Sequence, residues 1–252
     1  MSQFDVDLFV IGGGSGGVRA ARVAATHGAR VAIAEVSKWG GTCVVRGCVP
    51  KKLMVYASEV RHSLDDARGQ GWTVPPATFD WLTFITAKDK EIARLSAAYA
   101  ERLRKAGVRL FEARAHLIDD HTVEVGGERV TAANVLIATG GKPRLPPTGT
   151  WITSDDAFHL PELPASISIL GGGYIAIEFA HIFAGFGSRV TLVHRGDHIL
   201  RGFDPDVIAE VHRGLVAHGI EVVHAQTVPP GAAVAMSAIR KPLLRPPGFS
   251  AV

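Results

Sequence analysis

Cysteine is nearly absent from this chain: two of its 252 residues are cysteines, and both lie in one short stretch, GGTCVVRGCVPKK. Cys43 and Cys48 have no paired histidines or further cysteines beside them, which makes zinc a poor interpretation, and we predict no metal site. Structural disulfides are rare in the cytoplasm, where we place the chain. Two close thiols are therefore more typical of redox catalysis here.

Long apolar runs and a one-sided charge are also lacking. Asp5 and Asp7 stand where a secretory signal needs positive charge. The most apolar stretch, residues 167–187, contains three consecutive glycines, Glu178 and His181, which predicts a strand, a turn and a buried helix and no membrane span. Lys and Arg number 27 against 24 Asp and Glu, with no basic run between aromatics, so we expect no nucleic-acid surface.

What the chain does contain is one pattern twice: an apolar strand, a glycine turn, a helix and a second strand. The residues that fit G-x-G-x-x-G or its alanine variant are Gly12, Gly14 and Gly17 in the first copy and Gly171, Gly173 and Ala176 in the second. Such glycines let the backbone approach a pyrophosphate at the helix N-terminus. The pattern predicts an α/β fold with two Rossmann-like dinucleotide-binding domains. Glycine turns without a ligand are the alternative.

The ends of the two second strands differ in charge. Glu35 ends the first copy, where a carboxylate accepts hydrogen bonds from a ribose diol and repels a 2′-phosphate. The second copy has His194, followed by Arg195 and Arg201, and guanidinium groups bind phosphate through a planar fork. We predict an adenine dinucleotide with a free ribose in the first site and NADP in the second. For the two arginines, a solvated surface cluster is the alternative.

Three further segments organise the chain. Residues 80–105 have the spacing of a long amphipathic helix, capped by Thr78 or Asp80. Residues 108–130 are typical of a small antiparallel sheet, with VGGERV as its hairpin. A proline-rich linker follows near residues 143–149. We place the boundary there, with a first domain at 1–145, a partial second domain at 146–228 and an irregular tail at 229–252.

The two cysteines begin a segment with helical apolar spacing. On a regular helix, residues five apart lie too far along the axis to form a disulfide easily. We therefore expect a distorted first turn, with Gly47 and Pro50 as the points of irregularity. A thiol at a helix N-terminus near Lys51 should also have a lowered pKa. The segment predicts an active disulfide that links Cys43 to Cys48.

Four motifs in order, GGTCVVRGCVPKK, ATGG, GGGYIAIE and RGDHILRGFD, identify the chain as similar to the class I pyridine-nucleotide disulfide oxidoreductases. It most resembles the glutathione reductase branch, over roughly residues 4–227. The resemblance implies FAD in the first site, NADPH in the second, glutathione disulfide as the substrate and a part in redox homeostasis. A reductase like dihydrolipoyl dehydrogenase and a non-catalytic nucleotide-binding remnant are alternatives.

The resemblance also implies residue roles. Cys48 would lie against the flavin as the charge-transfer thiolate, and Cys43 would attack glutathione disulfide. Lys51 would approach the flavin and pair with Glu178, and Tyr174 would cover the flavin until the nicotinamide displaces it. The positions that would contact the two cofactors are Gly12, Gly14, Ser15, Gly16, Gly17, Glu35, Gly41, Thr42, Lys51, Thr139, Gly140, Gly171, Gly173, Tyr174, Ile175, Glu178, Arg195 and Arg201.

Arg22 and Tyr99 match positions that contact glutathione, with a surface arginine and a packed aromatic as the alternatives. Members of the family are nearly twice this length. They form homodimers through a further domain whose His–Glu pair protonates the leaving thiol. We expect the chain to be an N-terminal fragment, without that interface domain and with impaired activity. A frame-shifted reading would explain residues 229–252, which are rich in proline and free of acidic residues.

Overall fold

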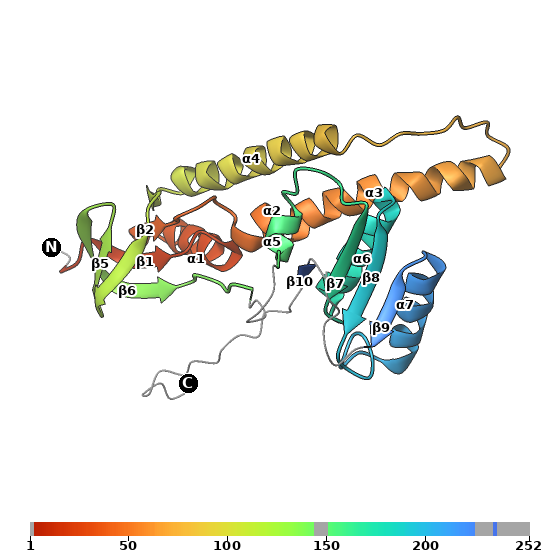
Figure 1. Ribbon diagram of the computed structural model, residues 1–252. Coiled ribbons are helices and arrows are strands. Elements are labelled where there is room, and N and C mark those ends of the chain that lie inside the picture. Colours follow the sequence, from red (N-terminus) through yellow and green to blue (C-terminus); the bar gives the residue numbers. More distant parts are fainter. Residues whose placement is uncertain (1–2, 144–150, 225–233, 236–252) are drawn as a thin grey trace.

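Two β-sheets, with long helices running between them, make up the computed structural model of the chain (Figure 1). The structure describes residues 3–143, 151–224 and 234–235. The boundary predicted between residues 145 and 146 lies outside the described residues, as does the predicted tail except for 234–235. The α/β fold that the repeated pattern predicts is confirmed.

The first sheet has six strands in the order β3-β2-β1-β6-β5-β4. The strands are β1 (Val6–Ile11), β2 (Val31–Ala34), β3 (Arg109–Phe111), β4 (Ala115–Asp119), β5 (Thr122–Val125) and β6 (Glu128–Ile137). The first four in this order run parallel, and β5 and β4 continue the sheet antiparallel. Gly126 and Gly127, between β5 and β6, have φ of 59° and 84°, which a two-residue hairpin turn of this kind requires. The predicted hairpin is confirmed.

The prediction of one antiparallel sheet over residues 108–130 is wrong for its first strand, because Arg109–Phe111 pairs in parallel with β2. The strand follows helix α4 (Trp81–Lys105), which contacts it and returns the chain in the direction of β2. Phe111 stacks on Phe9 in the core, with ring centroids 5.9 Å apart. A three-residue strand is too short to show a period, so its partner could not be predicted from the pattern.

Helices α1 (Ser15–Thr26) and α4 pack together and bury their apolar sides against the parallel strands of the first sheet. The helix predicted over residues 80–105 is confirmed, and Asp80 is its cap: the carboxylate accepts a hydrogen bond from the Thr83 N–H at 3.0 Å. α1 starts directly after the glycine turn at the end of β1. The packing of α1 thus holds that turn at the carboxyl edge of the sheet.

The second sheet is wholly parallel, in the order β10-β7-β8-β9. Its elements are α5 (Ser154–Ala157), β7 (Ser166–Leu170), α6 (Tyr174–Phe186), β8 (Arg189–His194), α7 (Pro205–Ala217), β9 (Glu221–His224) and β10 (Val234–Ala235). The strand, turn and buried helix predicted for the apolar stretch are confirmed as β7, its glycine turn and α6. No helix among the described residues has the length and apolarity to cross a membrane.

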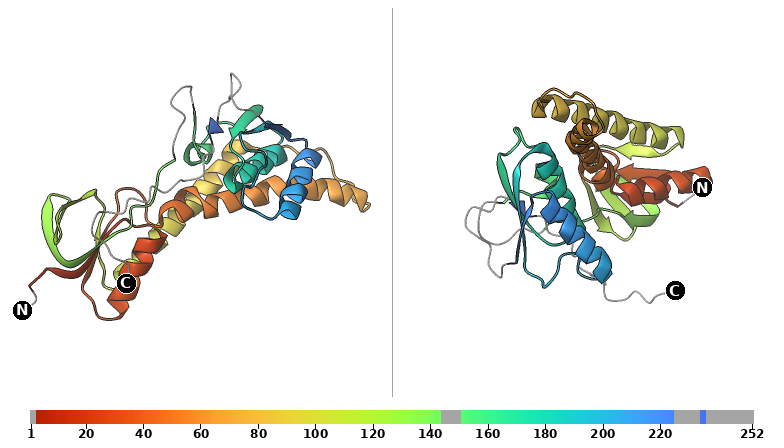
Figure 2. Two further views of the ribbon diagram at one scale, coloured as in Figure 1. Left: turned by 90° about the horizontal axis from the view of Figure 1, so that it is seen from below. Right: turned by 90° about the vertical axis from the view of Figure 1, so that its right-hand side faces the viewer.

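Helix α3 (Cys48–Gly69) connects the two sheets: it starts beside the first and runs on to α6 of the second (Figures 1 and 2). The two helices approach closely where Gly185 faces Ser58. A Cβ atom on Gly185 would lie 2.8 Å from the Ser58 Cβ and 2.9 Å from its carbonyl oxygen. The absence of a side chain at Gly185 therefore permits this crossing, and the crossing fixes the start of α3 relative to α6.

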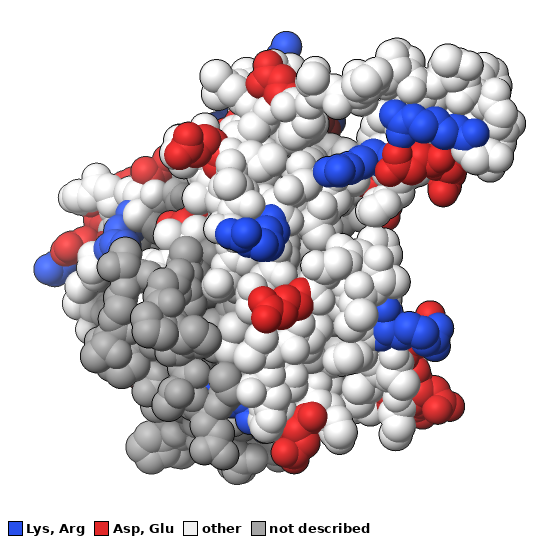
Figure 3. All heavy atoms as spheres, turned by 45° about the vertical axis from the view of Figure 1, so that its right-hand side comes forward, with Lys and Arg blue, Asp and Glu red and all other residues white. Residues whose placement is uncertain are grey.

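Charged side chains of both signs are interspersed over the face drawn in Figure 3, and neither sign forms a large patch there. This distribution agrees with the near balance of charge in the sequence.

Candidate active site

The two cysteines lie on either side of a break between two helices. Cys43 belongs to the short helix α2 (Gly41–Arg46), and Cys48 is the first residue of α3. Gly47 separates them, and a Cβ atom there would lie 2.7 Å from the Thr42 carbonyl oxygen. The predicted irregularity is therefore located at Gly47. It lets the chain double back closely, and both cysteines are free thiols.

The two thiols are close enough to influence each other. Burial, followed by the hydrogen bond with Cys48, raises the pKa of Cys43 to about 11. The lowered pKa expected for a thiol at this helix start is therefore wrong for Cys43. Cys43 is half-buried, whereas Cys48 is exposed.

Lys51 and Glu178 form an ion pair between the two halves of the structure. The Lys51 Nζ donates to Glu178 Oε1 at 2.8 Å, from the first turn of α3 to the first turns of α6. Their side chains are 30% and 35% exposed, so the pair is open to solvent and contributes no more than about 1 kcal/mol to stability. The Lys51 ammonium is therefore held by this carboxylate.

The first glycine turn is packed too tightly for side chains. Gly12 has φ of 115°, and a Cβ atom there would lie 2.3 Å from the Ala138 carbonyl oxygen. A Cβ atom on Gly17 would lie 1.9 Å from the Gly12 carbonyl oxygen. One on Gly41 would lie 2.4 Å from the Cα of Gly14, so the helix that carries Cys43 begins directly against this turn. The backbone N–H groups at the start of α1 are thereby left uncovered, which fits a pyrophosphate.

Glu35 is fixed by the same turn. Its two carboxylate oxygens accept hydrogen bonds from the N–H groups of Gly13 and Ser37, both at 2.8 Å. A carboxylate has about four lone-pair sites, so capacity remains for a ribose hydroxyl. Trp39 packs on Gly13, where a Cβ atom would lie 2.7 Å from the indole ring. The carboxylate is therefore pre-oriented at the end of β2.

The second turn is covered by the segment that carries both arginines, residues 195–203, which we name the arginine loop. The Leu200 N–H donates to the Gly172 carbonyl oxygen at 2.6 Å, and Leu200 has φ of 51°. Ile199 is buried, and its Cα would lie 3.4 Å from a Cβ on Gly172. Arg195 and Arg201 are exposed at the two ends of this anchored segment. The structure thus places the segment that carries both arginines against the second glycine turn.

The other predicted residues are mostly at the surface. Thr42, Thr139, Gly140, Ser15, Gly16 and Arg22 are exposed, and Ile175 is half-buried. The Tyr174 ring, 58% exposed, stands at the start of α6. Tyr99 packs against the core between α1 and α4, with the Arg102 guanidinium 5.9 Å from its ring centroid. Arg22 lies on α1 and Tyr99 on α4, two helices that pack against each other.

A family model described as pyridine nucleotide-disulphide oxidoreductase matches residues 6–233. The chain belongs to this family. Among curated relatives, the glutathione reductase of Nostoc sp. is 53% identical over 228 residues, which are 89% of this chain and 50% of the relative. That of Burkholderia cepacia is 50% identical over 225 residues, or 88% of this chain and 50% of the relative.

The chloroplastic/mitochondrial glutathione reductase of Pisum sativum is 43% identical over 233 residues, which are 87% of this chain and 42% of the relative. The chain therefore spans about half the length of these relatives. A solved structure, the Cu(II) complex of a mutant of the HOCl-induced flavoprotein disulfide reductase RclA from Escherichia coli, superposes with a TM-score of 0.79. It is 24% identical, with 96% of this chain and 58% of that chain covered, and so it shows the shared fold alone.

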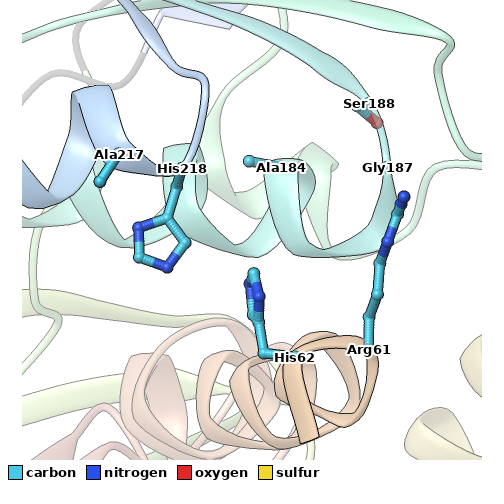
Figure 4. A pocket seen from close by; sticks show the side chains of 7 residues that line it. All are labelled: Arg61, His62, Ala184, Gly187, Ser188, Ala217 and His218. Carbon is cyan, nitrogen blue, oxygen red and sulfur yellow. The ribbon is translucent and has the colours of Figure 1, made fainter. Parts of the chain in front are cut away.

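This pyridine nucleotide-disulphide oxidoreductase has a further hollow of about 430 Å³ beside the helix crossing (Figure 4). Its lining residues are Arg61, His62, Ala184, Gly187, Ser188, Ala217 and His218. None of them is a predicted site residue. His218 makes edge-on ring contacts with His62 and His181, both at 5.0 Å between centroids. Among the described residues no group of three His, Cys, Asp or Glu could hold a metal ion.

Sequence reasoning missed the residues that hold the family's motifs in place. Trp39 and the Ser58–Gly185 contact carry no signal in the sequence, because they depend on how distant segments pack. The conformation of Leu200 could not be predicted either, since a leucine with positive φ is not expected from residue type. A GG pair at 40–41, both with positive φ, was the one available sign that a tight approach precedes Cys43.

Proposed function

We propose that the chain is the part of an NADPH- and FAD-dependent disulfide reductase that holds both dinucleotides and the redox-active thiols, with glutathione disulfide as the substrate. One observation carries the proposal: Cys43 lies in a short helix that begins against the first glycine turn, and Cys48 follows directly after the break at Gly47. Lys51, on the first turn of the same helix as Cys48, pairs with Glu178 of α6. The glutathione reductase relatives support the substrate and both coenzymes.

The residues of each turn suit the proposed dinucleotide. In the first, the closely packed glycines and the fixed Glu35 suit the pyrophosphate and free ribose of FAD. In the second, Arg195 and Arg201 suit the 2′-phosphate of NADPH. When bound, the two cofactors together supply an electron pair to the disulfide.

The thiols carry out exchange with the substrate. The Cys43 thiolate attacks one sulfur of glutathione disulfide, forms a mixed disulfide and releases one glutathione thiolate. The Cys48 thiolate then attacks the Cys43 sulfur, forms the Cys43–Cys48 disulfide and releases the second glutathione. The dithiol loses two electrons and the substrate gains them. Since the pKa of Cys43 is about 11 in the dithiol, the first attack needs a base to take its proton.

The remaining roles follow the resemblance. Lys51, held in place by Glu178, would supply a positive charge to the flavin, and the exposed Tyr174 would cover the flavin until the nicotinamide displaces it. Arg22 contributes a positive charge and Tyr99 an aromatic surface for anionic glutathione. We further propose that the intact protein works as a cytoplasmic homodimer.

Two single-cysteine variants, each loaded with FAD, test the proposal. Cys48→Ser leaves Cys43 and is expected to form a mixed disulfide when incubated with glutathione disulfide at alkaline pH, detected by intact mass. Cys43→Ser serves as the matched control and is expected to form far less, because FAD would lie against the otherwise exposed Cys48 thiol. The reverse result would exchange the two roles. If neither variant traps glutathione, while a small reagent alkylates both thiols, the chain is not a glutathione-disulfide reductase.

A further inference from the structure

The imidazole of His194 interacts with three other imidazoles in and around the arginine loop. His194 is the last residue of β8, His198 lies in the loop, His212 on α7 and His224 at the end of β9. The rings of His194 and His224 are 5.5 Å apart at their centroids. The cluster combines residues of β8, the arginine loop, α7 and β9, and the family resemblance assigns none of these histidines a role.

His194 is the buried member of this cluster. It is 7% exposed, and its Cβ would lie 3.2 Å from a Cβ on Gly172, so the ring sits directly under the second glycine turn. Its Nδ1 is buried and has no hydrogen-bond partner among the described residues. A buried polar atom without a partner is costly, which indicates that the site is completed by another state or ligand.

The cluster is connected to the loop through its backbone. The Nε2 of His224 lies 3.2 Å from the carbonyl oxygen of Arg195, the residue that follows His194. A change in the charge of His194 or His224 therefore alters the electrostatic environment of Arg195. A phosphate that pairs with Arg195 would in turn stand near both rings.

Burial, and to a lesser extent the neighbouring imidazoles, lower the pKa of His194, whereas the nearby Gly196 backbone opposes the shift. The charged groups that act on it are imidazoles alone. Of the carboxylates on the surrounding elements, Glu210 pairs within α7, Glu221 accepts from a threonine of β8, and Asp197 and Asp206 are exposed. None of these described carboxylates forms an ion pair with an imidazole of the cluster, so a ligand anion would be the first to do so.

We propose that this histidine cluster couples proton uptake to the binding of a ribose 2′-phosphate, so that the preference for NADPH over NADH depends on pH. The inference rests on the proposed function, because it deepens the assignment of NADPH to the second turn. His194 acts here as a specificity-determining residue through its charge. Arg195 and Arg201 remain the groups that contact the phosphate.

The sign follows from linkage. A phosphate dianion favours the protonated form of nearby imidazoles, so the pKa of His194 is higher in the complex than in the free chain. Affinity for the phosphate is then highest below the free pKa and falls as pH rises through the pKa of the complex. Each unit between the two values changes the dissociation constant by up to about tenfold.

The test compares 2′,5′-ADP with 5′-AMP on the full chain by titration calorimetry at several pH values. Proton uptake is read from the binding heat in two buffers of different ionisation enthalpy. The ligand phosphate titrates too, near pH 6, so the informative quantity is the difference between variants that bind the same ligand. The ratio of the dissociation constant of 5′-AMP to that of 2′,5′-ADP measures the preference for the 2′-phosphate. From pH 6 to pH 8 we expect this ratio to fall by a factor that is about tenfold larger in the wild type than in His194→Val.

Two more variants separate charge from position. His224→Gln can still donate to the Arg195 carbonyl but does not titrate, and it is expected to reduce proton uptake. His218→Gln removes an imidazole from the distant hollow and should change nothing. Identical pH profiles in wild type, His194→Val and His224→Gln would overturn the inference and leave NADPH in place. No preference for 2′,5′-ADP at any pH would overturn the coenzyme assignment and the inference with it.

Discussion

The two glycine turns share a backbone pattern but differ in how the acid or base at the strand end is held. At the first turn, Glu35 accepts hydrogen bonds from two backbone N–H groups and is fixed before any ligand arrives. At the second, His194 is buried, its Nδ1 has no hydrogen-bond partner within the described part of the chain, and the two arginines are exposed on an anchored loop. The same turn can therefore offer a rigid acceptor for hydroxyls or a set of cations for phosphate.

The turns also differ in what is attached to them. The first supports α2, because Gly41 contacts Gly14, and so the two cysteines are joined to this glycine turn. The second supports the arginine loop through Leu200 and Gly172. In the proposed function, the thiol chemistry therefore takes place beside the first turn, and the coenzyme is selected beside the second.

The largest expected effect removes the charge that distinguishes the second turn. Replacing Arg195 and Arg201 together by alanine should weaken NADPH by about 3–6 kcal/mol, since each charge-assisted contact contributes about 1.5–3 kcal/mol. Binding of NADH should change little. Fluorescence titration of both coenzymes measures this. A double variant that still prefers NADPH by the wild-type margin would contradict the comparison.

A smaller effect concerns the packing of the first turn. Gly17→Ala puts a Cβ atom 1.9 Å from a backbone oxygen that cannot move aside, and we expect a loss of about 1–3 kcal/mol in the free energy of unfolding. Gly16→Ala is the matched control on the same helix, where a Cβ meets nothing within 4 Å. It should be neutral or slightly stabilising. Urea unfolding measures the free energy of unfolding of both variants. An equal loss of stability in the two would show that the turn is not tight.

The smallest expected effect concerns the thiols that only the first turn carries. Cys48→Ser removes the neighbouring thiol that contributes to the raised pKa of Cys43, so this pKa should fall from about 11 but stay above the ordinary range. Burial, the larger cause, remains. At a fixed pH below the pKa, alkylation of Cys43 should therefore become faster. Rates with iodoacetamide from pH 7 to pH 11 give the value, and an unchanged or higher pKa would contradict the assignment.

Much of the fold could be predicted because its signals are local. The two glycine turns, the capped helix α4 and the hairpin at Gly126–Gly127 each depend on a few adjacent residues. The parallel pairing of β3 could not be predicted, since it depends on where α4 returns the chain. The pKa of Cys43 was missed for the same reason: the helix N-terminus is visible in the sequence, but the burial that outweighs it is not.

Helix α3 makes a stiff lever between the two sheets. Cys48 is its first residue and Ser58, the point of contact with Gly185, lies ten residues along, a distance of about 15 Å in a regular helix. A rod of this kind does not bend at its middle when a neighbour moves. If the second sheet shifts to admit or release its coenzyme, it must either slide over Ser58 or carry the thiol with it. A hinge for such a motion is therefore expected at Gly47, directly before α3 begins.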